Sequence, residues 1–228
     1  MSTSGSTDFG LVTNTIIDEA FDICGIGSEG ESISADQYSR ARRSLNLMAK
    51  SWAASDHLWL RTSASEALAA ATASYAITPK PTRILEMRRR DSNGYDTPLT
   101  EWSHAEYQDQ PNKAVTGVPV AYYYDPQRAS GTVYVWPTPG ASEAAEYALQ
   151  FTYLRTIEDF DDTTNDPDLP QEWTEALCYG LAERLALKYG VAPDIRSEIA
   201  QRAALLKAQI DSWDTEPASL FLQPEARW

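Results

Sequence analysis

Apolar residues recur at helical spacing in the first part of the chain. In the first predicted helix, residues 8–24, these positions are Val12, Ile16, Ala20 and Ile23. Steps of three and four place such side chains on one face of a helix, which then packs against a core. Thr7 or Asp8 is the expected N-cap. We therefore expect an amphipathic helix in this segment.

A second helix is expected after a glycine-containing loop. Ser34 and Gln37 have the spacing of a capping box, in which each side chain bonds the backbone N–H of the other residue. The apolar positions that follow are Tyr38, Ala41, Leu45, Met48 and Trp52. Arg40, Arg43 and Lys50 fall on the other side, so the pattern predicts one buried stripe and one basic face.

The same periodicity returns in two segments near the other end of the chain. Pro170 is expected to open a third helix, which runs to Tyr189 and stops at Gly190. Its apolar positions are Trp173, Ala176, Leu177, Leu181 and Leu185. Gly180 inside this helix costs about 1 kcal/mol relative to alanine, which indicates close approach by another helix. A fourth helix, residues 194–213, has Ile195, Ile199, Ala203, Leu206, Ile210 and Trp213 on one side.

The middle of the chain changes to short runs typical of β-strands. The predicted strands are residues 74–77, 83–90, 95–99, 120–124, 131–136 and 146–154. Asn93 and Gly94 are a hairpin turn signal, and residues 101–107 could form one short helix capped by Thr100. The last run alternates apolar and polar residues, as in a strand with one buried face. We expect one mostly antiparallel sheet of about five or six strands.

The C-terminal tail, residues 214–228, has no periodicity. It contains two prolines, and its large apolar residues are Leu220, Phe221, Leu222 and Trp228. Such a segment is either an end without order or a peptide that docks on a partner. An apolar cluster is uncommon in a purely solvating tail, so we favour docking.

These elements predict an α+β protein. The expected fold is a four-helix bundle formed by N- and C-terminal helical hairpins, with an inserted mostly antiparallel β-sheet domain and an extended C-terminal tail. The expected parts are residues 1–60, the N-terminal helical hairpin; 61–160, the inserted β domain; 161–213, the C-terminal helical hairpin; and 214–228, the tail. A chain of 228 residues is long enough to bury such a core.

The charge balance bears on nucleic acid as a partner. The chain has 19 Lys and Arg against 33 Asp and Glu, a net charge of −14. Proteins that grip DNA replace its counterions with cations, so the balance argues against specific DNA binding. An acidic wall suits a conduit through which DNA slides without sticking. No run approaches about 18 apolar residues, and no signal peptide is recognisable, so we expect a cytosolic protein without a membrane segment.

The motifs for catalysis and ligand binding are weak. Gly25, Gly27 and Gly30 match GxGxxG but follow a helix instead of a strand, so they more plausibly end that helix than cradle a phosphate. His57 and His104 lack the spacing of metal ligands and are expected to be partly exposed. No GxSxG elbow supports a serine nucleophile.

Acidic and thiol side chains also receive a structural interpretation. The acidic run comprises Glu158, Asp159, Asp161, Asp162, Asp166 and Asp168. It lacks the spacing of a calcium loop, so a solvated loop is the expectation. Cys24 and Cys178 are far apart and lack CxxC spacing, so they are interpreted as core thiols. We expect no catalytic residue, no metal and no cofactor.

Arg88, Arg89 and Arg90 lie on one predicted strand, which places two guanidinium groups on one face and one on the other. They are interpreted as a solvated strand end or as contacts with an acidic neighbouring subunit. The aromatic residues of the strands are Tyr122, Tyr123, Tyr124, Tyr134 and Trp136. They could form a stacking platform for sugars or bases, although such strands are more often half core.

Several stretches, taken in order, resemble the head-to-tail adaptor, or connector, family of tailed bacteriophages. The matching stretches are residues 44–52, 57–61, 133–139, 149–153 and 168–177, the last continuing to Tyr189 and Gly190. The resemblance implies a helical bundle with an inserted β domain and a ring of about twelve copies. It also implies a non-enzymatic virion protein of the neck, made in the host cytoplasm.

The resemblance further implies the partners. They are the portal protein, other copies of the chain, a downstream tail, stopper or nozzle protein, and double-stranded DNA that passes through the channel without specific binding. In such adaptors the C-terminal tail docks on the portal, which assigns the anchor role to Leu220, Phe221, Leu222 and Trp228. The alternatives are another neck or tail-completion protein such as a stopper, a virion peptidoglycan hydrolase that uses two carboxylates, and a sugar- or DNA-binding module.

Overall fold

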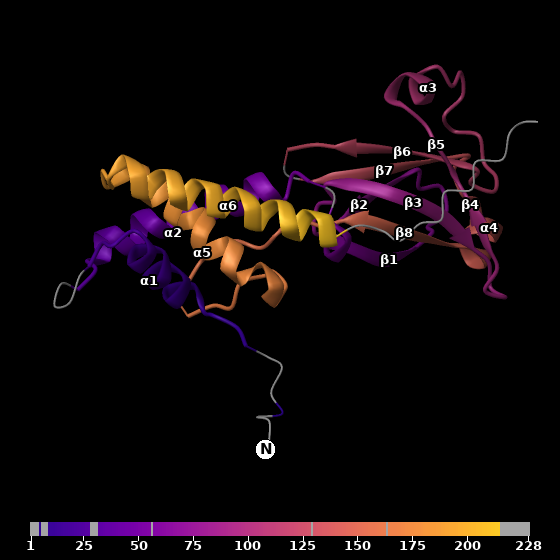
Figure 1. Ribbon diagram of the computed structural model, residues 1–228. Helices are drawn as coiled ribbons and strands as arrows, with labels where there is room; N and C mark the ends of the chain where they lie inside the picture. The colour runs from indigo at the N-terminus through magenta and orange to yellow at the C-terminus, as the bar shows by residue number, and fades with distance from the viewer. Residues whose placement is uncertain are drawn as a thin grey trace, which may run out of the picture. The chain divides into compact units, whose positions relative to one another are not determined.

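The computed structural model describes residues 5, 9–27, 32–55, 57–128, 130–162 and 164–214. The chain divides into two compact units (Figure 1). The helical unit combines residues 1–59 with residues 157–228, and the sheet unit comprises residues 60–156. Within the described residues, no helix is long and apolar enough to span a membrane.

The helical unit is built around α5 (Thr174–Lys188), which contacts α1 (Thr13–Ile23), α2 (Ala35–Trp52) and α6 (Pro193–Trp213). The buried residues of α5 occur around most of the helix: Ala176, Leu177, Cys178, Gly180, Leu181, Ala182, Leu185 and Ala186. A helix with so wide a buried surface must be covered by other elements on several sides. The four helices therefore share one core, while their strict bundle geometry stays a prediction.

The boundaries of three predicted helices are confirmed closely. Ser34 and Gln37 form the predicted capping box at the start of α2, and Gly190 follows the third helix with a φ of 68°. That helix opens with a 3-10 turn, η2 (Gln171–Trp173), before α5 proper. On α6, Ile195 and Trp213 are exposed, so the predicted apolar face was drawn too wide at both ends.

The predicted start of the first helix was wrong. Helix α1 begins at Thr13, and its N-cap is Val12. The backbone N–H and the hydroxyl of Thr13 both donate to the carbonyl oxygen of Asn165, at 3.1 and 2.9 Å. A distant segment thus satisfies the first exposed donor of the helix. Thr7 and Asp8, the predicted caps, lie outside the described residues.

The sheet unit contains two four-stranded sheets instead of the single sheet that was predicted. The first has the order β1-β8-β3-β4 and the second β2-β7-β6-β5. Their strands are β1 (Arg61–Ala67), β2 (Ser74–Ile77), β3 (Arg83–Arg90), β4 (Asp96–Pro98), β5 (Thr100–Glu101), β6 (Ala121–Pro126), β7 (Gly131–Trp136) and β8 (Ala148–Leu154). All pairings of named strands are antiparallel except β5 with β6.

One core cluster joins the two sheets. It takes Ile84, Met87, Leu149, Phe151 and Tyr153 from the first sheet and Tyr75, Ile77, Tyr122, Val133 and Val135 from the second. On β8 the buried and half-buried residues alternate, which confirms the predicted single buried face. A sheet that buries one face needs a second layer, and here the other sheet supplies it.

The chain enters and leaves the sheet unit at adjacent points. Strand β1 pairs antiparallel with β8, and its first residue, Arg61, lies opposite the last residue of β8, Leu154. The backbone N–H of Arg155 also donates to the carbonyl oxygen of Leu60, at 3.0 Å. The first and last strands of the insertion therefore close on each other.

Two short helices lie in the sheet unit, α3 (His104–Gln108) and α4 (Ala141–Glu146). The predicted short helix at residues 101–107 is displaced: Thr100 and Glu101 form β5, and Ser103 caps α3 through a capping box with Glu106. The predicted β3–β4 hairpin is confirmed, with Gly94 at a φ of 88°.

Gly180 lets α5 approach α2 closely, as its position in the sequence predicted. A Cβ atom at Gly180 would lie 2.8 Å from Sδ of Met48 and 3.2 Å from Cζ2 of Trp52. Outside their own residue and its neighbours in the chain, real Cβ atoms essentially never have a heavy atom within 3.0 Å. The glycine is therefore required by the packing of the two helices.

We predict that Gly180→Val lowers the free energy of unfolding by about 1–3 kcal/mol, since the added atoms overpack the α2–α5 contact. Thermal or urea unfolding measures the change. Glu183→Val is the matched control, because Glu183 is exposed on the same helix. Valine is a better helix former than glycine, so a Gly180→Val variant at least as stable as the wild type would show that the contact tolerates a Cβ atom.

Candidate docking surface at the end of α6

The C-terminal end of α6 is fixed by a buried histidine–aspartate pair. Nδ1 of His57 lies 2.9 Å from Oδ2 of Asp214, and both side chains are 5% exposed. The backbone N–H of Leu58 donates to both carboxylate oxygens of Asp214, at 3.1 and 3.2 Å. Nε2 of His57 lies 3.2 Å from the carbonyl oxygen of Trp52. Asp214 thereby ties the end of α6 to the segment that follows α2.

The ring of His57 has acceptors at both of its nitrogens. A neutral imidazole carries one N–H and can donate to only one partner, whereas both the Asp214 carboxylate and the Trp52 carbonyl accept. The earlier expectation that His57 is partly exposed was wrong, because its partner lies 157 positions away in the sequence.

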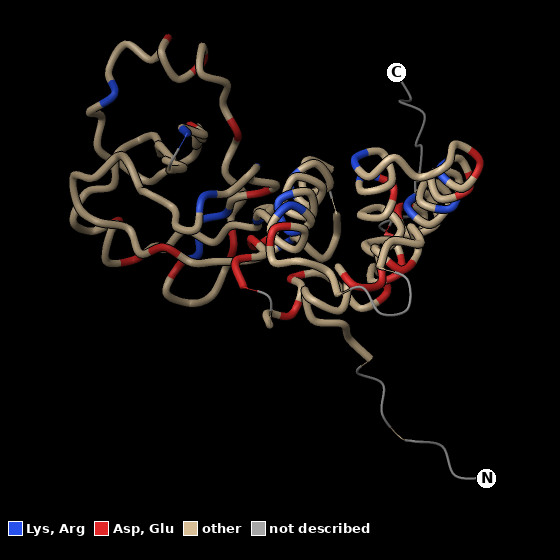
Figure 2. The backbone as a smooth tube through the Cα atoms, turned by 90° about the vertical axis from the view of Figure 1, so that its left-hand side faces the viewer, with Lys and Arg blue, Asp and Glu red and all other residues tan. Residues whose placement is uncertain are grey.

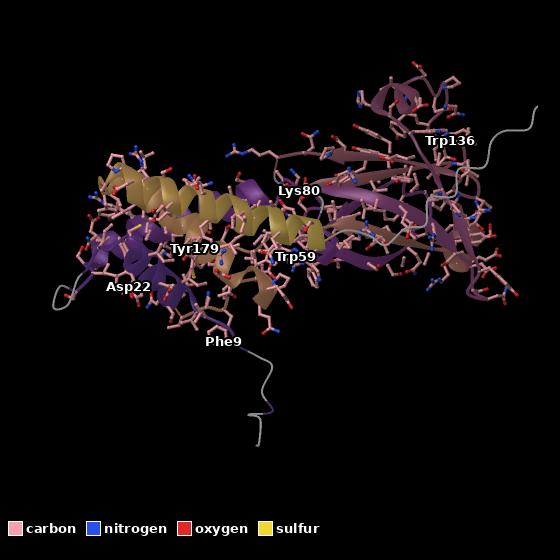
Figure 3. All side chains as sticks on the ribbon, viewed as in Figure 1. Phe9, Asp22, Trp59, Lys80, Trp136 and Tyr179 are labelled. Atoms are coloured by element: carbon pink, nitrogen blue, oxygen red, sulfur yellow. The ribbon has the colours of Figure 1, made fainter. Side chains whose placement is uncertain are left out.

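Aromatic rings enclose this pair. The ring of Trp173 meets the edge of His57 with centroids 4.8 Å apart, and Trp59 stacks on His57 at 6.1 Å. Trp52 and Lys207 pack on the same cluster, with the Lys207 ammonium 5.2 Å from the ring centre of Trp173. Figure 3 labels Trp59. Such surroundings exclude water and strengthen the hydrogen bonds of the pair.

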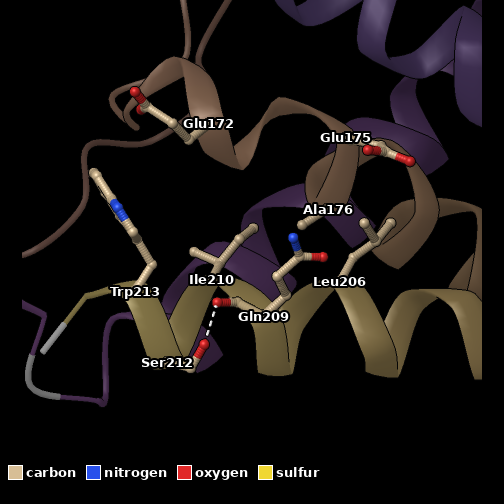
Figure 4. A pocket seen from close by; sticks show the side chains of 8 residues that line it. All are labelled: Glu172, Glu175, Ala176, Leu206, Gln209, Ile210, Ser212 and Trp213. Atoms are coloured by element: carbon tan, nitrogen blue, oxygen red, sulfur yellow. Dashed lines mark hydrogen bonds between the residues drawn. The ribbon is translucent and has the colours of Figure 1, made fainter.

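A groove of about 540 Å³ adjoins the pair, between the start of α5 and the end of α6 (Figure 4). Its buried floor is Ala176, Leu206 and Ile210. Trp213 stands at its edge and is 67% exposed. The rim also carries Glu172, Glu175, Gln209 and Ser212. The volume falls within the range of about 300–1,000 Å³ typical of binding pockets, so this groove can receive apolar side chains.

The three arginines of β3 divide as predicted. Arg88 pairs with Glu86 at 2.6 Å, and Arg90 pairs with Asp96 at 2.7 Å. Arg89 is bonded elsewhere, donating to the carbonyl oxygen of Pro119 at 2.8 Å. The Arg90 guanidinium lowers the pKa of Asp96 below its usual value through their hydrogen bonds. Two of the three charges are therefore already balanced within the subunit.

The glycines, cysteines and second histidine singled out in the sequence lie in different parts of the fold. Gly25, at a φ of 66°, follows α1 and ends it, whereas Gly30 lies outside the described residues. Cys24 and Cys178 are free and buried, as predicted, and burial raises their pKa to about 11 and about 12. His104 is exposed and lies 3.1 Å from the hydroxyl of Tyr123.

The tyrosines of the strands are divided between the core and the surface, and the acidic loop lies at the surface. Tyr122 lies in the core between the sheets, while Tyr123 and Tyr134 stack with ring centres 5.9 Å apart. The acidic loop is largely exposed, with Asp159 paired to Lys50 at 2.7 Å. Lys and Arg lie among Asp and Glu in both units (Figure 2). Among the described residues, no three His, Cys, Asp or Glu side chains gather as metal ligands.

Comparison with known proteins identifies the family. The model of the SU10 adaptor protein family matches residues 14–220, which is most of the chain. The chain belongs to the SU10 adaptor protein family. The predicted resemblance to phage head-to-tail adaptors is thereby confirmed, and the chain is a structural protein of the connector type.

Other comparisons add little to this assignment. The curated proteins contain no match. One solved structure, described as the neck of an empty GTA particle computed with C6 symmetry, aligns with 86% of this chain and 93% of that chain. The two chains are 11% identical with a TM-score of 0.29, so the family match carries the assignment.

The predicted docking anchors of the adaptor, Leu220, Phe221, Leu222 and Trp228, lie outside the described residues. Their portal contact thus stays a prediction. The structure instead describes Asp214, after which the tail begins. Sequence reasoning missed the pairing of this residue with His57. The only available signal was Asp214 directly after an apolar helix face, and nothing in the sequence connects it with His57.

We predict that His57→Ala and Asp214→Ala each lower the free energy of unfolding by about 3 kcal/mol, because each leaves a buried polar partner unpaired. The double variant should lose less than the sum, with a coupling of about 1–3 kcal/mol. Urea unfolding of the four proteins measures it.

The matched control is the exposed pair Arg40 and Asp36, which are 2.7 Å apart. Its coupling should stay below about 0.5 kcal/mol, as for other exposed ion pairs. A His57–Asp214 coupling no larger than that of this control would show that the pair does not hold the end of α6.

Proposed function

We propose that the chain is a head-to-tail adaptor that forms a ring of about twelve copies beneath the portal. The ring extends the DNA channel and connects the capsid to a downstream tail, stopper or nozzle protein. The protein has no enzymatic role and is located at the neck of the virion, after synthesis in the host cytoplasm. The family match over residues 14–220 carries this proposal.

The charge of the chain supports a channel role. With a net charge of −14, a ring of such subunits repels the phosphate backbone on average, so DNA can slide past without specific binding. The pairing of Arg88 and Arg90 with carboxylates of the same subunit is consistent with a surface that does not grip DNA.

The portal contact is assigned to the tail anchors Leu220, Phe221, Leu222 and Trp228. Burying one such side chain contributes about 1.5–3 kcal/mol, much of which ordering the tail consumes. One tail therefore binds weakly. Many tails on one symmetric portal gain through effective concentration, which explains a ring that assembles only on its partner.

We predict that native mass spectrometry shows a monomer alone and a ring of about twelve copies when portal is added. Deleting residues 215–228 should abolish the portal-bound ring while the chain stays folded, which far-UV circular dichroism measures. A stable small oligomer that ignores the portal would contradict the proposal and favour another neck component, which would bind the adaptor ring instead.

The proposed subunit contacts of Arg88, Arg89 and Arg90 have a separate test. Arg88→Ala should weaken ring formation on the portal by about tenfold if it bridges to an acidic neighbour, and added salt should weaken the wild-type ring in parallel. Arg128→Ala is the control, since Arg128 is exposed on a loop. Equal ring formation in both variants would show that Arg88 does not contribute to the interface between subunits.

A further inference from the structure

We infer that, before the portal is met, the tail of the same chain folds back and places Leu220, Phe221 and Leu222 in the groove at the end of α6. This latch rests on the proposed function, because it withholds the residues assigned to the portal. The occupant of the groove is then the apolar segment of the tail that follows Asp214.

The chemistry of the groove favours an apolar occupant. Its floor is apolar and formed by Ala176, Leu206 and Ile210. Trp213 is largely exposed at its edge, at 67%, although tryptophan is highly buried on average. An exposed indole beside a hollow of about 540 Å³ is a surface that gains stability when an apolar segment covers it.

The tail is long enough for its apolar cluster to reach the groove. Leu220 follows Asp214 by six positions, which span up to about 20 Å when extended. Leu206, at the far end of the groove, precedes Asp214 by eight helical positions, or about 12 Å. The apolar cluster of the tail can therefore reverse direction and cover the whole groove.

The tail also begins at a fixed position in the helical unit. Asp214 is held by the ring of His57 and by the backbone N–H of Leu58, so the tail starts beside the groove and not at a variable distance from it. A short tether of this kind gives an effective concentration in the millimolar range, about as high as short flexible linkers provide. Weak apolar contacts are then sufficient for occupancy.

The consequence is a competition between two sites for the same three side chains. While they lie in the groove they are unavailable to the portal, and the apolar segment is not exposed to other copies. A portal that offers many equivalent pockets displaces the tails together, since each docked neighbour raises the local concentration of the next.

Hydrogen exchange of the full chain tests the latch. We compare peptides covering residues 171–176 and 206–213 in the wild type and in Leu220→Ser/Phe221→Ser/Leu222→Ser, which keeps the length of the tail. Exchange of these peptides should rise about fivefold or more in the variant. Ala218→Ser/Gln223→Ser/Ala226→Ser is the matched control and should exchange as the wild type does.

Two results would overturn the latch. Unchanged exchange in the anchor variant would show that the groove is empty or holds something else. Protection that disappears on tenfold dilution would show that the tail of a second copy fills the groove instead of the chain's own tail.

Portal association separates the latch from the proposed function. Trp213→Ala removes the groove edge but keeps the anchors, so it should associate with the portal several-fold faster than the wild type, while the anchor variant should not bind. If no form binds the portal but the exchange difference persists, the proposed function fails and the latch stands. Unchanged association of Trp213→Ala with a portal that the wild type binds would contradict the latch.

Discussion

Burial of α5 is the constraint on which the helical unit depends. Because the buried residues of this helix extend around most of its circumference, neither the N-terminal helices nor α6 alone can cover it. Both must pack on it, although nearly a hundred residues of sheet unit separate them in the chain. Gly180 then sets how closely α2 approaches. After the sheet unit, the chain therefore returns to pack on its own first helices.

Periodicity predicted most of the elements for a clear physical reason. Helix α2 has a capping box, α5 is followed by Gly190 and α6 begins at Pro193, and β8 alternates between buried and half-buried residues. Strand β1 escaped prediction because its sequence, RTSASEA, is mostly exposed and has no apolar alternation. The number of sheets also escaped, since alternation indicates that one face is buried but not which strands will lie beside it.

The candidate site was predictable only in part. The arginines of β3 alternate between faces as any strand residues do, so their division followed from sequence. The pairing of His57 with Asp214 did not, because no local pattern joins residues 157 positions apart. The pair exists because α2 and α6 both pack on α5. The groove beside it likewise belongs to the packed helices and to no single segment.

The pairing of the first and last strands of the sheet unit has a consequence for how such proteins can change. Arg61 and Leu154 face each other across β1 and β8, so the two connections to the helical unit leave from neighbouring positions. A module whose ends meet can be shortened, enlarged or exchanged for another while the host that carries it keeps its own fold.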